Sequence, residues 1–232
     1  MKDTSVISVE HVSKIYDEFT IPVKALDDVS FSVDQAEFIA IKGPSGSGKT
    51  TLLNAMGGLD KPSHGKIIIG GHEVTNLSGS ALVNFRLHHI GFVFQSFNLI
   101  PVFTAEENIG LIMELKKINR HEIQKRVNEL LEQIGLTDKA KKRPFELSGG
   151  QQQRVAVARA LAGKPQFILA DEPTTNLDSA SASKLLDLMQ SLNQKEQMTF
   201  IFSTHDQRVI ERARRIITLD DGRIVSDEKI SV

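Results

Sequence analysis

Residues 38–53 read FIAIKGPSGSGKTTLL, and this stretch decides the fold. The apolar run from Phe38 to Ile41 predicts a buried strand, and the apolar residues from Leu52 onward predict a helix. The turn between them follows the pattern Gly-x-x-x-x-Gly-Lys-Ser/Thr. Glycine lets the backbone approach an anion closely, so that amide groups and the positive end of the helix can face phosphates. The stretch therefore predicts a strand, a phosphate-binding loop and a helix.

The predicted loop carries its own charged and hydroxyl groups. Lys49 adds a full positive charge, and the hydroxyl of Thr50 is placed to bind Mg²⁺ beside the terminal phosphates. The alternative is a glycine-rich turn with an exposed lysine. The flanking strand and helix make this alternative the weaker interpretation.

Three further segments share one arrangement, an apolar run that ends in a polar residue. They are residues 90–94 ending at Gln95, residues 167–170 ending at Asp171 and Glu172, and residues 200–204 ending at His205. Continuous apolar runs are typical of strands that are covered on both faces, as in a parallel sheet flanked by helices. Ligands of such sheets bind outside the carboxyl ends of the strands. We therefore expect four strand ends to converge on one nucleotide.

Charge and position assign roles to these polar residues. Asp171 is expected to hold Mg²⁺ through its water shell, and Glu172 to accept a proton from the attacking water. His205 is expected to hydrogen-bond the terminal phosphate. Gln95 offers a donor and an acceptor, which suits contact with Mg²⁺ and the water. Each residue alone is compatible with a structural role, but together with the phosphate loop they predict a hydrolytic site.

Residues 147–151, Leu-Ser-Gly-Gly-Gln, precede a second helix-compatible segment. Ser148 and Gln151 form a capping-box pattern, which needs no ligand. Gly149 and Gly150 also expose backbone amides at the positive end of a helix, which predicts a second anion site. Because the first phosphate site is already complete, a second one suggests a second molecule.

Composition bounds the remaining possibilities. With 232 residues, 40% of them hydrophobic and 25% charged, the chain has the size and composition of one globular domain. No apolar stretch approaches the length of a membrane span, so membrane work is expected to need a partner. A net charge of −1 argues against a nucleic-acid binder, and zero cysteines exclude disulfides and thiolate metal sites.

These motifs give the chain a resemblance to the nucleotide-binding subunits of ABC transporters over nearly its full length. The phosphate loop, Gln95, residues 147–151, Asp171 with Glu172, residues 176–178 and His205 occur in that family's order. The resemblance implies an α/β fold, namely a P-loop NTPase core with a mostly parallel sheet, an N-terminal antiparallel β-subdomain and an inserted α-helical subdomain. It implies one domain over residues 1–232. Residues 1–95 and 165–232 would form the core lobe, and residues 96–164 the helical subdomain.

The resemblance also implies a head-to-tail homodimer that binds ATP and Mg²⁺. ATP on the phosphate loop of one subunit would be sealed by Ser148 and Gly150 of the other, which belong to the family's signature residues 147–151, and Tyr16 would stack on adenine. The implied ATP-binding residues are Tyr16, Gly43, Pro44, Ser45, Gly46, Ser47, Gly48, Lys49, Thr50, Thr51, Ser148, Gly149, Gly150, Gln151 and Asp178. The implied catalytic residues are Glu172, His205 and Gln95, and the implied metal-binding residues are Thr50, Gln95 and Asp171.

Within the family the chain is similar to the lipoprotein-release, macrolide-efflux and cell-division group, on the evidence of residues 91–101 and 150–161. This similarity implies membrane permease subunits with a large extracytoplasmic domain, and a peripheral position on the cytoplasmic face of the inner or plasma membrane. A groove beside Gln95 would receive a short helix of the permease. The candidate contacts are Phe97, Leu99, Ile100, Phe103, Glu106 and Glu107.

Three other functions stay open. The same ATPase could drive signalling to an extracytoplasmic enzyme, as the cell-division members are thought to do, and its ATPase residues would look identical. A soluble ABC ATPase acting on DNA or ribosomes is disfavoured, because the chain has no basic excess and no second ATPase domain. A P-loop kinase would have no use for residues 148–151. The transported substrate is not encoded in any motif of this chain.

Overall fold

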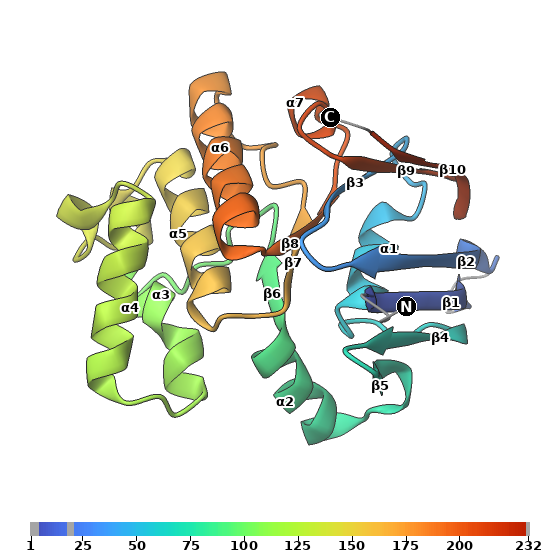
Figure 1. The fold of residues 1–232 in the computed structure, drawn as a ribbon, viewed down its shortest axis with the longest axis horizontal. Helices are drawn as coiled ribbons and strands as arrows, with labels where there is room; N and C mark the ends of the chain where they lie inside the picture. Colours follow the sequence, from blue (N-terminus) through green and yellow to red (C-terminus); the bar gives the residue numbers. More distant parts are fainter. Residues whose placement is uncertain (1–4, 18–20, 231–232) are drawn as a thin grey trace.

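Two sheets organise the computed structural model, which describes residues 5–17 and 21–230 (Figure 1). The central sheet has six strands in the order β10-β9-β3-β8-β7-β6. The strands from β9 to β6 run parallel, and β10 pairs antiparallel with β9. The strands are β3 Phe38–Lys42, β6 Ile90–Val93, β7 Phe167–Asp171, β8 Thr199–Ser203, β9 Arg215–Asp220 and β10 Arg223–Lys229.

The second sheet is antiparallel, with four strands in the order β2-β1-β4-β5. They are β1 Ser5–Tyr16, β2 Val23–Asp34, β4 His64–Ile69 and β5 His72–Glu73. Buried residues of this sheet, such as Val9 and Leu26, share one apolar cluster with Ile39 of the central sheet and Leu52 of the first helix. The predicted N-terminal antiparallel subdomain is therefore confirmed, and it packs directly against the element that carries the phosphate loop.

Helices cover the central sheet, and three of them connect β6 to β7. These three, α3 to α5, lie together at the side of the molecule away from the antiparallel sheet (Figure 1). The helices are α1 Lys49–Met56, α2 Gly79–His89, α3 Ala105–Leu115, α4 Arg120–Gln133, α5 Gly149–Ala162, α6 Ser179–Glu196 and α7 Gln207–Ile210. Single 3₁₀ turns are η1 Val74–Asn76, η2 Thr137–Lys139 and η3 Pro144–Glu146. Within residues 5–17 and 21–230, none of these helices is both long and apolar enough to cross a bilayer.

The helical insertion follows from apolar spacing along α4. Val127, Leu130 and Leu131 lie on one face of this helix and are at most 3% exposed. They belong to a cluster that also contains Ile168 of β7 and Phe200 of β8. The inserted helices thus share a core with the central sheet. The lobe boundaries after residues 95 and 164 stay predictions.

The parallel register aligns the strand ends that carry polar residues. Ser203 at the end of β8 lies opposite both Ile41 of β3 and Asp171 of β7, and Val93 of β6 lies opposite Ala170. Because parallel strands point the same way, the residues that follow them emerge at one edge. This edge is where the site forms.

Candidate nucleotide-binding and hydrolysis site

The phosphate loop requires glycine at the start of α1. Gly48 has a φ of 99°, in the left-handed region that other residues avoid. A Cβ atom there would lie 2.3 Å from the carbonyl oxygen of Ala25. The first turn of α1 contains no acidic side chain, and no side chain caps it. The amide groups at the positive end of α1 are thus left for an anion.

The Lys49 side chain folds back onto the phosphate loop. Its Nζ donates hydrogen bonds of 2.9 Å and 2.8 Å to the carbonyl oxygens of Gly43 and Pro44, and the residue is 8% exposed. A buried ammonium held by carbonyls of its own loop is already positioned for a phosphate. The geometry agrees with the role predicted for Lys49.

A cleft of about 620 Å³ opens over the loop, within the usual size range of ligand sites. It brings together residues from distant parts of the chain, including Gln95, Glu172 and His205. The other predicted residues that line it are Gly43, Pro44, Ser45, Gly46, Gly48, Lys49, Thr50 and Thr51. Its outer wall also contains Val23, Lys24, Ala25, Asp221 and Gly222, which the sequence patterns did not single out.

Ser47 supports the loop from below. It is 3% exposed, and its carbonyl oxygen accepts a hydrogen bond of 3.1 Å from the amide of Gly222 in the turn between β9 and β10. That turn also accepts, through the Gly222 carbonyl, a hydrogen bond from the amide of Asp27. A hairpin far along the chain therefore braces the phosphate loop.

Glu172 and His205 contact each other in the cleft. His205 Nδ1 lies 2.6 Å from Glu172 Oε1, and the hydroxyl groups of Thr204 and Thr175 each donate to Oε2 at 3.4 Å. Glu172 has a φ of 45°, a backbone conformation that costs a non-glycine residue roughly 1–3 kcal/mol. Strain of this kind clusters at functional sites. The pair thus has the geometry of a general base oriented by a neighbouring imidazole.

Thr50 and Asp171 form an oxygen-rich corner at the end of β7. The Thr50 hydroxyl lies 3.1 Å from each carboxylate oxygen of Asp171. Hydroxyl, carboxylate and amide oxygens are the hard ligands that Mg²⁺ prefers, and Mg²⁺ commonly takes only one or two carboxylates together with substrate phosphates. Thr50 and Gln95 line the cleft, and Asp171 contacts the Thr50 hydroxyl, so the three side chains offer oxygen ligands that fit the ion.

The segment at Gln95, here called the glutamine loop, is hydrogen-bonded to the loop that follows β7. The Asn176 side-chain amide donates a hydrogen bond of 2.9 Å to the Gln95 carbonyl oxygen. No sequence pattern indicated this bond, because the two residues lie 81 positions apart. The loop that follows Glu172 is therefore bonded to the backbone at Gln95.

The signature residues form the predicted capping box at the start of α5. Ser148 Oγ accepts from the Gln151 amide at 3.3 Å, and Gln151 Oε1 accepts from the Ser148 amide at 2.8 Å. A Cβ atom on Gly149 would lie 3.5 Å from the Asn176 carbonyl oxygen. These residues thus lie beside the glutamine loop, and they do not line the cleft over the phosphate loop of the same chain. Their role toward ATP stays a prediction.

Asp178 has a structural task at the start of α6. Its carboxylate caps the helix by accepting a hydrogen bond of 3.0 Å from the Ser181 amide. Hydrogen bonds from Ser181 hold the pKa of Asp178 below its usual range. The predicted contact of Asp178 with ATP stays a prediction.

Tyr16 is half-buried beside the cleft. It lies directly opposite Val23 in the β1–β2 pairing, and Val23 lines the cleft. Its hydroxyl donates a hydrogen bond of 2.6 Å to Asp60 Oδ2. Burial, followed by the bond to Asp60, raises the pKa of the phenol. Stacking on adenine stays a prediction.

A second network, absent from the sequence predictions, joins the loops that carry Glu172 and His205. Thr174 Oγ1 donates a hydrogen bond of 2.6 Å to Asp206 Oδ2, and Arg208 donates to both carboxylate oxygens. The Arg208 guanidinium lowers the pKa of Asp206 to about 2. Asp206 follows His205 directly in the sequence, so this network fixes the backbone next to the imidazole.

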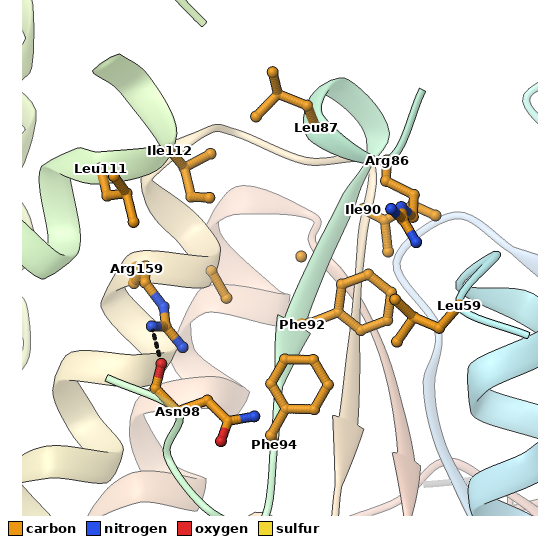
Figure 2. Close-up of a pocket in the computed structure, with 12 residues that line it drawn as sticks. Leu59, Arg86, Leu87, Ile90, Phe92, Phe94, Asn98, Leu111, Ile112 and Arg159 are labelled. Carbon is orange, nitrogen blue, oxygen red and sulfur yellow. Dashed lines mark hydrogen bonds between the residues drawn. The ribbon is translucent and has the colours of Figure 1, made fainter. Parts of the chain in front are cut away.

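A separate apolar groove of about 320 Å³ lies beside β6. Figure 2 shows Leu111 and Ile112 of α3 on one side and Arg159 pointing to Asn98. Phe92 of β6 and Phe94, which follows that strand, lie on the other side. Arg159 donates a hydrogen bond of 2.6 Å to the Asn98 carbonyl oxygen. The groove also contains Leu59, Arg86, Leu87, Ile90, Gly91 and Ala160.

None of the residues predicted to contact a permease helix lines this groove, and their contact with a permease stays a prediction. Leu99 packs against the apolar cluster of the helical insertion, and the backbone of Ile100 is held by hydrogen bonds to buried Asn108. Glu107 is used as a cap of α3. The segment after Gln95 turns back into the helical core, because Phe97 and Asn98 adopt positive φ angles of 55° and 49°. Phe97, Phe103 and Glu106 are likewise not among the groove residues.

Comparisons with known proteins agree with this geometry. The family model described as "ABC transporter" matches residues 26–175. The chain is 46% identical to an uncharacterized ABC transporter ATP-binding protein of Thermotoga maritima, over 98% of this chain and 97% of that protein. It is 44% identical to the lipoprotein-releasing system ATP-binding protein LolD of Francisella tularensis subsp. holarctica, over 94% and 95%.

A solved structure shows the same arrangement. It is described as the dimeric structure of a post-hydrolysis state of the ATP-binding cassette MJ0796 bound to ADP and Pi. The TM-score is 0.91 and the identity 42%, covering 97% of this chain and 99% of that one. The likeness therefore covers nearly the whole chain and its fold.

Proposed function

The chain belongs to the ABC transporter family of ATP-binding proteins, and from this premise we propose that it powers a membrane complex of the lipoprotein-release and macrolide-efflux type. It binds and hydrolyses ATP as the nucleotide-binding subunit of an ABC transporter. The observation that supports this type of complex is the 44% identity to the lipoprotein-releasing system ATP-binding protein. The 2.6 Å contact between Glu172 and His205, in the same cleft as the phosphate loop, supports the hydrolysis of ATP.

The chain's own residues divide the work of hydrolysis. Lys49 and the amides at the start of α1 bind the phosphates, and Glu172 takes a proton from the attacking water. His205 orients the Glu172 carboxylate and hydrogen-bonds the terminal phosphate. Gln95 positions the water from the opposite side of the cleft. When bound at Thr50, Asp171 and Gln95, Mg²⁺ would neutralise charge on the phosphate oxygens.

We propose that two copies of the chain act as a head-to-tail dimer. In one chain, Ser148 and Gly150 lie outside the cleft over the phosphate loop, so the cleft has one open side. Ser148 and the amides of the second copy's α5 would cover the terminal phosphate from that side. The dimeric state of the solved MJ0796 cassette supports this arrangement.

The apolar groove is the proposed docking site for the membrane subunit. It is lined by Phe92, by Phe94, which immediately precedes Gln95, and by Leu111 and Ile112 of α3. A short apolar helix in this groove would contact Phe94, so a shift of the neighbouring Gln95 would be transmitted to that helix. By similarity to the lipoprotein-releasing system, we expect permease subunits with a large extracytoplasmic domain, and a peripheral position at the cytoplasmic face of the membrane.

An alternative function uses the same ATPase residues. The dimer could drive a membrane protein that activates an extracytoplasmic enzyme and moves no substrate. The groove and the cleft would serve both functions equally, so the identity of the membrane partner distinguishes them.

The test is to identify that partner. Glu172→Gln protein carrying an affinity tag is trapped with ATP, native membranes are solubilised in mild detergent, and the proteins that co-purify are identified by mass spectrometry. A membrane protein with few spans and a large extracytoplasmic domain would support the proposal. Capture of ribosomes or soluble proteins alone would leave the ATPase in place and exclude the transport role.

A further inference from the structure

Tyr16 is the only tyrosine of the chain, and two charged residues hold its side chain. Lys14 Nζ lies 4.8 Å from the centroid of the Tyr16 ring. Asp60 Oδ2 accepts the Tyr16 hydroxyl at 2.6 Å, and Asp60 Oδ1 accepts from Lys14 Nζ at 2.5 Å. The three side chains form a closed triangle. None of them is used by the phosphate loop or by the Glu172–His205 pair.

Two elements hold the triangle, namely strand β1 and the turn that follows helix α1. Lys14 and Tyr16 both lie on β1, and their side chains contact each other and the same Asp60 carboxylate. Asp60 follows α1, and the turn that carries it folds back onto the helix, because the amides of Leu59 and Asp60 both donate to the Asn54 carbonyl oxygen. Lys14 also donates to the Lys61 carbonyl oxygen at 2.8 Å. The ring is thus joined to the helix whose first turn holds the phosphate loop.

The position of the ring relative to the cleft follows from strand pairing. Directly opposed residues of antiparallel strands point to the same face, and Tyr16 is opposite Val23, which lines the cleft. The Thr51 hydroxyl also lies beside the phenol and lines the cleft. The aromatic ring therefore lies next to the part of the cleft wall that Val23 and Thr51 form.

We propose that Lys14 and Asp60 are positioning residues for recognition of the nucleotide base, which hold the Tyr16 ring with one face covered by the ammonium and the other presented to a purine. The proposal rests on the proposed stacking role of Tyr16. A ring fixed before binding loses little freedom when the base arrives, which strengthens binding. The Lys14 side chain is 14% exposed and that of Asp60 28%, so solvent weakens the contacts only in part.

The test compares a nucleotide with the same anion lacking its base. Affinities for ADP and for inorganic pyrophosphate are measured by titration calorimetry, because neither ligand is hydrolysed during the titration. Lys14→Met and Asp60→Asn are expected to weaken ADP binding by roughly 3- to 30-fold and to leave pyrophosphate binding within about twofold. A purely structural defect would weaken both ligands together.

The matched control is Glu10→Gln. Glu10 pairs with Lys66 at 2.9 Å on the same sheet, and this pair has no contact with Tyr16. This variant should bind both ligands as the unchanged protein does. Lys49→Ala should weaken both, which shows that pyrophosphate reports on the phosphate loop.

Tyr16→Ala distinguishes the stacking role of Tyr16 from the positioning role of Lys14 and Asp60. If Tyr16→Ala weakens ADP selectively while Lys14→Met and Asp60→Asn do not, the stacking role stands and the positioning role is wrong. If Tyr16→Ala leaves ADP affinity unchanged, the stacking role fails and the positioning role fails with it. Selective loss in all three variants supports the proposal.

Discussion

Glu172 combines three features that suit a general base. It adopts a left-handed backbone conformation, it lies 2.6 Å from His205, and its second oxygen meets only the long hydroxyl contacts of Thr204 and Thr175. One oxygen is thus oriented by the imidazole, and the other is only weakly engaged. This asymmetry suits a group that must accept a proton from water.

Replacing Glu172 by Gln therefore has a specific expected result. The amide keeps the shape of the side chain but no longer accepts a proton, so ATP turnover should fall roughly 100- to 10,000-fold. ATP affinity, measured by equilibrium binding, should stay close to that of the unchanged protein. Turnover that stays normal in this variant would remove Glu172 from the role of base.

Asp206 makes a pH-dependent contribution to stability. Its pKa is lowered from the ordinary value of 3.8 to about 2, first by its hydrogen bonds with Arg208. A group with a depressed folded-state pKa stabilises the protein fully above its unfolded pKa, and this contribution is lost as pH falls toward the folded value. The contribution is therefore present above about pH 4 and disappears by about pH 2.

We expect Asp206→Asn to lower the free energy of unfolding near neutral pH. The difference from the unchanged protein should narrow as pH falls from about 4 to about 2, because the unchanged carboxylate then becomes protonated. Urea titrations at a series of pH values measure this difference. A difference that is constant over this range would contradict the assigned role of the Arg208 pair.

At the scale of secondary-structure elements, the apolar groove depends on the meeting of β6 with α3. Neither element shows the groove in its own sequence, since Leu111 and Ile112 belong to an ordinary amphipathic helix. The groove arises because the chain after Gln95 turns into the helical insertion and leaves the side of β6 open. Contacts with a membrane subunit are therefore expected on α3 rather than at Leu99.

Leu111→Arg tests this placement. A charged side chain in the groove should reduce capture of the membrane partner, because a buried unpaired charge is costly. Leu115→Arg is the matched control, since Leu115 lies on the same helix, is 56% exposed and does not line the groove. Co-purification yield from membranes is the measurement. Equal capture by both variants would place the docking site elsewhere.

At the scale of the whole molecule, the site is one-sided. Glu172, His205 and Lys49 all line the cleft over the phosphate loop. The signature residues 147–151 of the same chain do not line it, and Gly149 lies beside Asn176. The Asn176–Gln95 hydrogen bond connects those two regions within one chain. A second copy that supplied its own Ser148 to the cleft would thus couple the two sites.

Ser148→Arg should prevent this association. In the Glu172→Gln background with ATP, the protein is expected to sediment as a dimer. The additional Ser148→Arg change should leave it monomeric, because the large side chain would fill the space between the start of α5 and the phosphate that this helix end would face. Ser80→Arg, at an exposed position of α2, is the control and should still dimerise. Dimers of the Ser148→Arg variant would contradict the head-to-tail arrangement.

The local sequence was sufficient to predict the elements that carry the chemistry. The phosphate loop, the strands before Gln95, Asp171 and His205, and the capping box at Ser148 all occur where local patterns predicted them. Each of these depends on interactions between residues close in sequence: apolar runs that form strands, glycines that accept left-handed angles, and side chains that cap their own helix.

Tertiary structure alone decided which distant residues meet. The fold brings together the Asn176–Gln95 bond, the Thr174–Asp206–Arg208 network, the Lys14–Tyr16–Asp60 triangle and the groove on α3. Each joins segments far apart in the sequence, by 81 positions in the Asn176–Gln95 bond. Such pairs leave no periodic signal in one sequence, because their contact depends on strand order and helix packing. The sequence by itself therefore determined the phosphate loop and the strand ends, and the fold determined how their side chains are oriented and connected.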